Sequence, residues 1–218
     1  MSMNSFEADA LIRSELTSIY TFLRQYSREL IVVTFAMLFL TLAEHHSIGS
    51  RWADSLLFYA ALPLLTILII LRKNPLDFGL RIGNPGVWGL HVLAVCVISL
   101  PILYVFSKAG SFEDYYTISD FTLPVYFLEM IGYQAGWEFI FRGFLLFGLK
   151  ERFKEGAILI QMIPFLMLHL GKPEVEVIST IPMGIYFGYI AYRGNSFWPA
   201  FMIHLYINVL FRVFVNWF

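Results

Sequence analysis

Residues 132–149 read GYQAGWEFIFRGFLLFGL, an apolar stretch with one glutamate and one arginine near its middle. The apolar run extends upstream, so that Leu123–Phe147 is long enough to cross a hydrocarbon core of about 30 Å as a helix. Charged side chains are costly inside a bilayer, and each is a functional candidate unless a structural partner explains it. Glu138 and Arg142 therefore make this predicted transmembrane helix the first candidate for a functional site.

Six further apolar stretches end at charged or turn-forming residues. They run roughly over Leu30–Leu42, Ser55–Leu71, Val87–Phe106, Ala157–Leu170, Val175–Tyr192 and Phe197–Trp217. Only 14% of the 218 residues are charged, against about one quarter in soluble domains, and the apolar runs account for this deficit. We predict an all-α fold, a polytopic transmembrane helix bundle of about seven spans.

The first 29 residues differ from the rest because they carry three arginines and four acidic residues. They are too long and too acidic for the basic start of a signal peptide. From about Ala8 to Tyr26 an amphipathic helix on the membrane surface is predicted. We therefore expect an N-terminal cytoplasmic segment over residues 1–29 and a single transmembrane domain over residues 30–218.

Two features of the composition exclude other classes of protein. Lysine and arginine together number 15 against 16 acidic residues, so no basic excess points to nucleic acid as a partner. The single cysteine, Cys96, lies in an apolar run. It permits neither a disulfide framework nor a cluster of thiolate ligands, and we expect it to serve in packing.

The numbers of lysine and arginine residues alternate between successive connections. Connections on one side of the predicted bundle hold ten of them, and those on the other side hold three. Because cytoplasmic loops carry the positive excess, we predict a multi-pass protein of the plasma (cell inner) membrane. Its N-terminus would lie in the cytoplasm and its C-terminus outside.

The ionisable side chains inside the predicted spans include seven candidates: Glu129, Glu138, Arg142, His169, Glu176, His204 and Arg212. Glu138 and Arg142 are four residues apart and can pair on one helix face, which would also suit a purely structural ion pair. His204 and Asn208 have the same spacing, and His169 precedes a Gly-Lys-Pro break. A lone histidine in a membrane helix is commonly a packing residue. Two histidines and a glutamate on separate spans instead favour a functional site.

The estimated depths of these polar residues agree. At 1.5 Å of rise per residue, Glu138 and His169 each lie about 18 Å from the cytoplasmic ends of their spans. His204 and Asn208 lie roughly 10 and 16 Å from the start of theirs. All four fall near the middle of the bilayer, as a shared site requires. Small residues that permit close helix approach flank them: Gly132, Ala135, Gly136, Gly143, Gly184 and Gly188.

The chain resembles the CPBP family of CAAX proteases and bacteriocin-processing enzymes, and is similar to its type II CAAX prenyl endopeptidases. The family's motifs are EExxxR, FxxxH and HxxxN. Their counterparts here are Glu138 with Arg142, Phe165 with His169, and His204 with Asn208. The resemblance covers about Arg72 to Asn208, and it implies that residues 30–218 form a protease-like domain.

One position departs from the family pattern. Trp137 stands where the family has its first glutamate, which is usually assigned the activation of water. Either Glu138 acts as the base in this chain, or the chemistry has been lost. We favour the first alternative because both histidines and the asparagine remain.

The resemblance implies hydrolysis of a peptide bond near the end of a membrane-associated protein or peptide. Glu138, beside Arg142, would take a proton from water, and His169 would share the water or protonate the leaving amine. His204 and Asn208 would donate to the oxyanion. No cofactor is expected. Zinc is an alternative, since one glutamate and two histidines are acceptable ligands, but no HExxH spacing is present.

Two rival functions remain open. A catalytically silent membrane binding or immunity protein could keep the same fold, and Trp137 favours it. A small transporter could also use acidic, basic and imidazole groups at the midplane, but it would more often show an internal repeat. Under every alternative the lipid bilayer is a partner. The substrate of the enzyme stays open between a prenylated tail, a bacteriocin leader and a C-terminal sorting signal.

Overall fold

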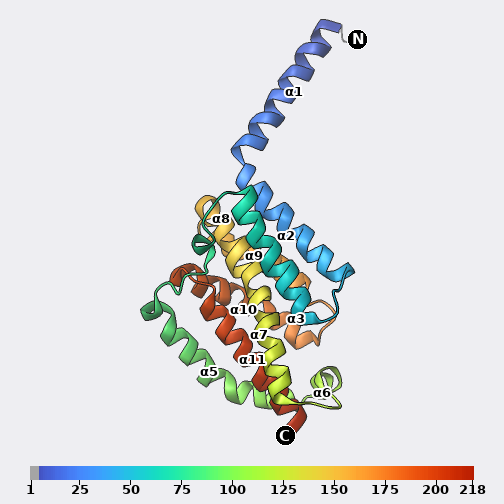
Figure 1. Cartoon of the computed structure of the whole chain (residues 1–218), viewed down its shortest axis with the longest axis vertical. Helices are drawn as coiled ribbons and strands as arrows, with labels where there is room; N and C mark the ends of the chain where they lie inside the picture. Colours follow the sequence, from blue (N-terminus) through green and yellow to red (C-terminus); the bar gives the residue numbers. More distant parts are fainter. Residues whose placement is uncertain (1–4) are drawn as a thin grey trace.

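The computed structural model describes the backbone of residues 5–218 and the side chains from Asp9 onward. Within this range the chain forms helices joined by short connections, and no strand (Figure 1). The α-helices are α1 Ser5–Gln25, α2 Ser27–His45, α3 Arg51–Asp54, α4 Leu62–Leu65, α5 Pro85–Ser107, α6 Gly110–Tyr116, α7 Leu123–Glu138, α8 Leu146–Phe153, α9 Gly156–Met167, α10 Glu174–Gly194 and α11 Trp198–Trp217. Three π-helical segments, η1 Ser55–Ala61, η2 Thr66–Ile70 and η4 Phe139–Leu145, and one 3₁₀ turn, η3 Pro75–Phe78, complete them.

Each of the seven predicted apolar stretches contains a helix, although residues 168–170 at the end of the fifth stretch form a turn. Four helices are long and apolar enough to cross a membrane, Arg51–Ile70, Pro85–Ser107, Glu174–Gly194 and Trp198–Trp217, or five if the bent pair of α1 and α2 is one span. The helix α9 is apolar but has only 12 residues, about 18 Å of rise. The all-α transmembrane bundle is confirmed, whereas the number of seven spans stays a prediction.

The N-terminal helix α1 projects from the bundle and meets α2 at a bend of 76° (Figure 1). Its apolar side chains Ile12, Leu16 and Ile19 are more than half exposed. They share one helix face because they are spaced by three and four residues. The structure thus contains the predicted amphipathic helix, while its position on a membrane surface stays a prediction.

The helix with the candidate glutamate lies at the centre of the bundle. Every residue from Gly136 to Leu149 is buried, and α2, η1 and α9 pack around this stretch. A second buried cluster joins α10 and α11, with α5 against it. A helix that is apolar around its whole circumference is expected in such a central position.

Glycines allow the close helix contacts that the sequence predicted. A Cβ atom at Gly136 would collide with the backbone oxygen of Ser55, so α7 rests directly on η1. A Cβ at Gly188 would lie 2.7 Å from the amide nitrogen of Gln161, which brings α10 onto α9. Gly132 leaves more room, with Trp52 at 3.4 Å from the corresponding position. Small residues therefore set the spacing of two helix pairs.

Connections with many basic residues meet at one end of the bundle. Arg28, at the start of α2, forms an ion pair with Glu151 near the end of α8. At the opposite end, Lys108 after α5 donates a hydrogen bond of 3.2 Å to the carbonyl of Phe214 in α11. The helix α1 and the end of α11 also lie at opposite ends (Figure 1). This arrangement agrees with the alternation of charge, and the direction in which the bundle crosses the membrane stays a prediction.

Candidate active site

Glu138 and Arg142 form the ion pair that their spacing predicted. Glu138 is the last residue of α7, and the π-helical segment η4 that follows carries Arg142. Nη1 of Arg142 donates to Oε1 of Glu138 at 3.2 Å and lies at the same distance from Oε2. Neither side chain is exposed. Short π-helical stretches occur frequently at functional sites.

His204 joins the pair from α11. Its Nδ1 lies 2.5 Å from Oε1 of Glu138. An ionised carboxylate can only accept, so Nδ1 carries the hydrogen, and Nε2 is the acceptor nitrogen when the ring is neutral. The estimated depths predicted that these two residues, 66 positions apart in the sequence, share one layer. In the structure they are in contact.

His169 lies near this group without a hydrogen bond to it. It follows the end of α9 by two residues, in the turn before α10, rather than inside a helix as the sequence analysis expected. Its Nδ1 donates to the carbonyl of Phe165 at 2.7 Å, so Nε2 is again the acceptor nitrogen of a neutral ring. The side chain is 4% exposed.

The ring of Phe165 lies against both histidines and the arginine. Its ring centroid lies 4.6 Å from that of His169 and 6.1 Å from that of His204. The guanidinium carbon of Arg142 lies 3.9 Å from the same centroid, a distance at which a cation is attracted to the face of a ring. The aromatic residue of the FxxxH motif thus connects the three helices of the site.

Asn208 lies one turn beyond His204, but its side chain is engaged with its own helix. Its Nδ2 donates to the backbone carbonyl of His204 at 3.0 Å. It makes no hydrogen bond to the carboxylate or to an imidazole among the described residues. The expected shared face is present, and its donation to an oxyanion stays a prediction.

Sequence reasoning missed a contribution from α10. The ring centroid of Phe187 lies 5.6 Å from that of His204 and 5.3 Å from the guanidinium carbon of Arg142. The signal that could have revealed it is the pair of glycines, Gly184 and Gly188, on either side. Glycines permit a close approach, and a phenylalanine between them can reach the neighbouring helices.

Trp137 occupies an aromatic environment at the position of the family's first glutamate. Ring centroids between 5.4 and 6.2 Å away belong to Tyr59, Tyr133, Phe141, Phe165 and His169. Its Nε1 is buried without a hydrogen-bond partner among the described residues. A carboxylate in this place would lie beside His169 but among rings.

Replacing Trp137 with glutamate is therefore expected to destabilise the protein by about 3 kcal/mol or more, because a charge would be buried among rings. Thermal unfolding in detergent measures the change. Trp137→Phe is the control, since it removes ring area without adding charge. A Trp137→Glu protein as stable as Trp137→Phe would mean that the space beside His169 accepts a solvated carboxylate.

The other three candidates from the predicted spans lie elsewhere. Glu176 accepts from the Tyr116 hydroxyl at 2.5 Å and from Lys172 Nζ at 2.7 Å, and Arg212 donates to the carbonyl of Tyr116. Burial and the neighbouring Glu176 carboxylate raise the pKa of Tyr116, which keeps its hydroxyl a donor. Glu129 is exposed, with no ion-pair partner in the described part of the chain. These three residues do not join the site.

The residues of the zinc alternative are engaged with other groups. Glu138 and His204 are hydrogen-bonded to each other, and Nδ1 of His169 donates to a backbone carbonyl. Over the range that the structure describes, no group of three or more histidine, cysteine, aspartate and glutamate side chains is arranged to hold a metal ion. The choice between a metal-free and a zinc mechanism stays a prediction.

Comparison with known proteins bears on the family. The family model described as type II CAAX prenyl endopeptidase Rce1-like matches residues 120–210, a range that includes the site from Trp137 to Asn208. No curated protein and no solved structure matches the chain. The family match supports an intramembrane endopeptidase of the CAAX type in general, and the apolar helices support a multi-pass membrane protein. Over residues 120–210 the chain is thus similar to the Rce1-like type II CAAX prenyl endopeptidases, which supports the CPBP family that its motifs predicted.

Proposed function

We propose that this protein hydrolyses a peptide bond near the end of a membrane-associated protein or peptide, using a water molecule activated by Glu138. One observation carries the proposal: the fully buried carboxylate of Glu138 contacts His204 at 2.5 Å and Arg142 at 3.2 Å in the centre of the bundle. A base and positioned donors are what amide hydrolysis requires.

Unpartnered polar atoms suggest where the water binds. Oε2 of Glu138 and both Nε and Nη2 of Arg142 are buried and make no hydrogen bond among the described residues. A buried water makes about three hydrogen bonds to such groups. One acceptor on Glu138 and two donors on its ion-pair partner Arg142 would together hold such a water.

The proposed reaction conserves its protons. The water oxygen attacks the substrate carbonyl carbon while one of its protons passes to Glu138. If His204 is to donate from Nε2 to the oxyanion while Nδ1 stays on Glu138, both ring nitrogens must carry a proton in this step. The second amide hydrogen of Asn208 is the other donor. The carbon–nitrogen bond then breaks. The proton held by Glu138 passes to the leaving amine, directly or through His169.

A comparison of cells with and without the protein tests the function. Mass spectrometry of the ends of membrane proteins is expected to find uncleaved precursors in the cells that lack it, and mature ends when the wild-type protein is restored. The same method identifies the substrate class, whether a prenylated tail, a leader or a sorting signal. Unchanged protein ends would favour the silent binding or immunity protein, which the aromatic surroundings of Trp137 also suit.

The predicted orientation gives a direct expectation. A reporter enzyme that works only outside the cytoplasm is expected to be active when fused after Phe218, and inactive when inserted near Lys154. The reason is that the connections with ten basic residues lie on the side of Lys154. A cytoplasmic fluorescent reporter at the same two positions is the control. The reversed pattern at both positions would invert the orientation.

Metal dependence can be measured on the purified protein. Proteolysis in detergent is expected to survive strong chelation, because Glu138 and His204 are bonded to each other. Activity is measured with and without EDTA or phenanthroline, with a known zinc protease as the control. A loss that stoichiometric zinc restores would instead make Glu138, His169 and His204 candidate ligands.

A further inference from the structure

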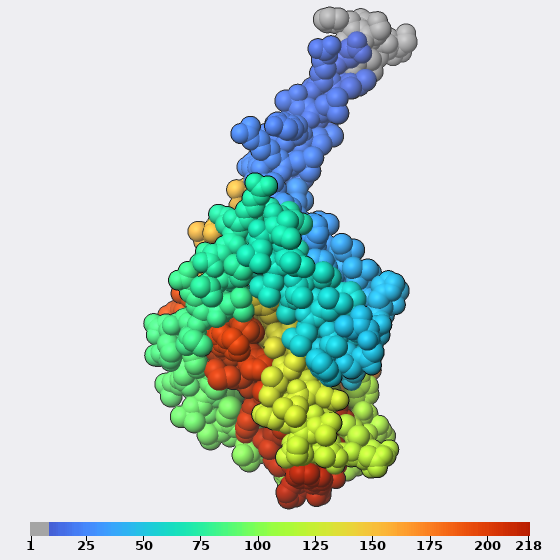
Figure 2. Space-filling view, viewed as in Figure 1, coloured from blue at the N-terminus to red at the C-terminus, as the bar shows by residue number. Residues whose placement is uncertain are grey.

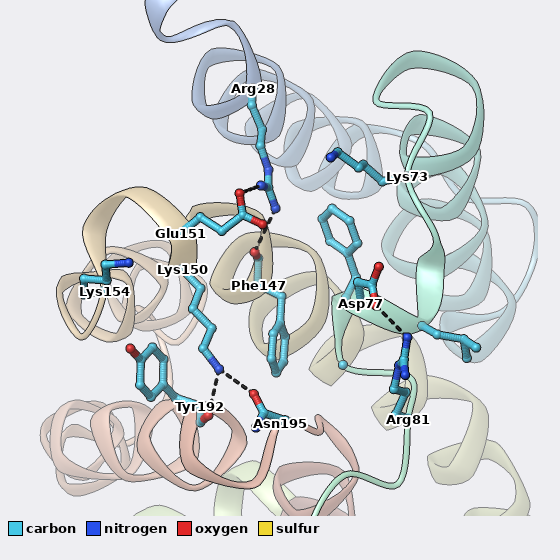
Figure 3. A pocket seen from close by; sticks show the side chains of 13 residues that line it. Arg28, Lys73, Asp77, Arg81, Phe147, Lys150, Glu151, Lys154, Tyr192 and Asn195 are labelled. Carbon is cyan, nitrogen blue, oxygen red and sulfur yellow. Dashed lines mark hydrogen bonds and ion pairs between the residues drawn. The ribbon is translucent and has the colours of Figure 1, made fainter.

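A cavity of about 500 Å³ lies at the end of the bundle where α2 begins and α8 ends (Figure 3). Five cationic side chains line it, Arg28, Lys73, Arg81, Lys150 and Lys154. They come from three segments that are far apart in the sequence. The cavity is separate from the candidate active site, because Lys150 follows Glu138 by twelve residues, about 18 Å along the helix.

The two acidic residues that line the cavity are already paired. Asp77 accepts from Arg81 at 2.8 Å, and Glu151 forms an ion pair with Arg28 (Figure 3). Each pair joins one arginine to one carboxylate. The positive charge that remains in the cavity therefore belongs to its three lysines.

None of these three lysines forms an ion pair with a carboxylate of the described residues. Lys150 donates only to neutral acceptors, the carbonyl of Tyr192 at 3.0 Å and Oδ1 of Asn195 at 2.6 Å. The side-chain ammonium groups of Lys73 and Lys154 make no hydrogen bond or ion pair with any residue that the structure describes, and Figure 3 shows the two side chains on different sides of the cavity. Unneutralised cations around a hollow attract an anion.

The backbone of Lys154 adds a second observation. Its φ is 50° and its ψ is −130°, a combination that L-residues rarely adopt. Strained residues persist where the surroundings hold them, and they cluster at ligand sites. Lys154, the strained residue, is also one of the two lysines whose ammonium groups have no partner among the described residues.

The neighbouring helix α1 indicates which layer of the membrane the cavity faces. Arg28 follows the 76° bend between α1 and α2, where the chain leaves the basic end of the bundle (Figure 1). The exposed apolar face of α1, with Ile12, Leu16 and Ile19, suits the boundary between headgroups and acyl chains. A cavity beside this bend then lies at the level of the lipid phosphates.

We propose that this cavity binds a phosphate-bearing anion, and that the headgroup of an anionic phospholipid supplies it. Lys73 and Lys154 would contact the phosphate, with Lys150 between them. Basic pockets between transmembrane helices on the cytoplasmic side are suited to such headgroups. The volume of about 500 Å³ is within the usual range of small-molecule sites.

The full-length protein in neutral detergent allows a direct test. Its thermal unfolding is followed during titration with short-chain phosphatidylglycerol, short-chain phosphatidylcholine or inorganic phosphate, since a ligand of the folded state raises the Tm. The test variant is Lys73→Gln with Lys154→Gln. The control is Arg24→Gln with Arg193→Gln, which removes the same charge from the same predicted side outside the cavity.

Phosphatidylglycerol is expected to raise the Tm of the wild type and the control more than phosphatidylcholine does. The variant Lys73→Gln with Lys154→Gln should need at least about tenfold more phosphatidylglycerol for the same rise in Tm. A response to inorganic phosphate equal to that to phosphatidylglycerol, and lost in the lysine variant, supports the phosphate site and assigns a soluble source. Equal responses to both lipids, or equal losses in test and control variants, would overturn the proposal.

A second variant guards against misfolding of the first. Lys154→Gly removes one ammonium group and places at this position a residue that adopts a positive φ readily. It is expected to keep or raise the Tm without lipid and to weaken the response to phosphatidylglycerol. An unchanged response to the lipid in this variant would remove Lys154 from the site and contradict the proposal.

Discussion

Glu138→Gln is expected to lower proteolysis at least about a hundredfold, because glutamine keeps the volume and the hydrogen bonds of the side chain but cannot take a proton from water. The activity must be expressed per folded molecule. Arg142 loses its counter-charge in this variant, although its guanidinium still lies 3.9 Å from the ring centroid of Phe165, so stability is also expected to fall.

Glu129→Gln is the matched control for this experiment. It makes the same substitution on the same helix α7, at an exposed side chain, and it should leave both activity and stability unchanged. Glu138→Asp separates charge from geometry, because it keeps the carboxylate but shortens its reach toward His204. It is expected to stay more stable than Glu138→Gln while losing activity.

Two outcomes would reject the proposed mechanism. If Glu138→Gln keeps near-normal proteolysis while His169→Ala abolishes it, Glu138 has a structural role and another group activates the water. If neither change affects any phenotype, the catalytically silent protein is the better description. Both outcomes leave the family match over residues 120–210 unaffected.

Spacing and depth predicted the contacts that depend on helix geometry alone. The interval of four residues predicted the pair of Glu138 and Arg142, which forms at 3.2 Å. Equal depth predicted that His204 would meet Glu138, and the two lie 2.5 Å apart. Both arguments use only the rise and the period of a helix, which tertiary packing changes little.

The direction in which a side chain points and the local breaks in a helix could not be predicted in this way. Depth does not determine which way a side chain faces, so His169 shares the layer of the site but contacts it through Phe165. The amide of Asn208 bonds to its own helix, a choice between rotamers that leaves no pattern in the sequence. The π-helical segment η4 also departs from the regular period directly after Glu138.

The fold shows the same division. The apolar runs predicted where helices form, because burial or lipid contact requires such runs. They did not predict that α9 ends at Met167, nor that α1 leaves the bundle at a bend of 76°. The length of a helix depends on its neighbours as well as on its own composition. For this reason hydropathy alone does not determine the number of spans.

Arg142→Gln is expected to destabilise the protein by about 3–5 kcal/mol, since it removes one partner of a buried ion pair and leaves the other charge behind. Arg142 is fully buried, and it also stacks near Phe165 and Phe187. Activity is expected to fall as well, because Nε and Nη2 of Arg142 are the proposed donors to the water. Reversible unfolding in detergent would measure the change in stability.

A double-mutant cycle isolates the ion pair within this effect. The combined variant Glu138→Gln with Arg142→Gln removes both charges, so it should be less destabilised than the sum of the two single variants, by about 0.5–3 kcal/mol. Arg142→Lys keeps the charge but loses the planar group that lies over Phe165, and an intermediate loss is expected. Strictly additive changes would mean that Arg142 acts through packing alone, so that Glu138 would rely on His204 to remain charged in the centre of the bundle.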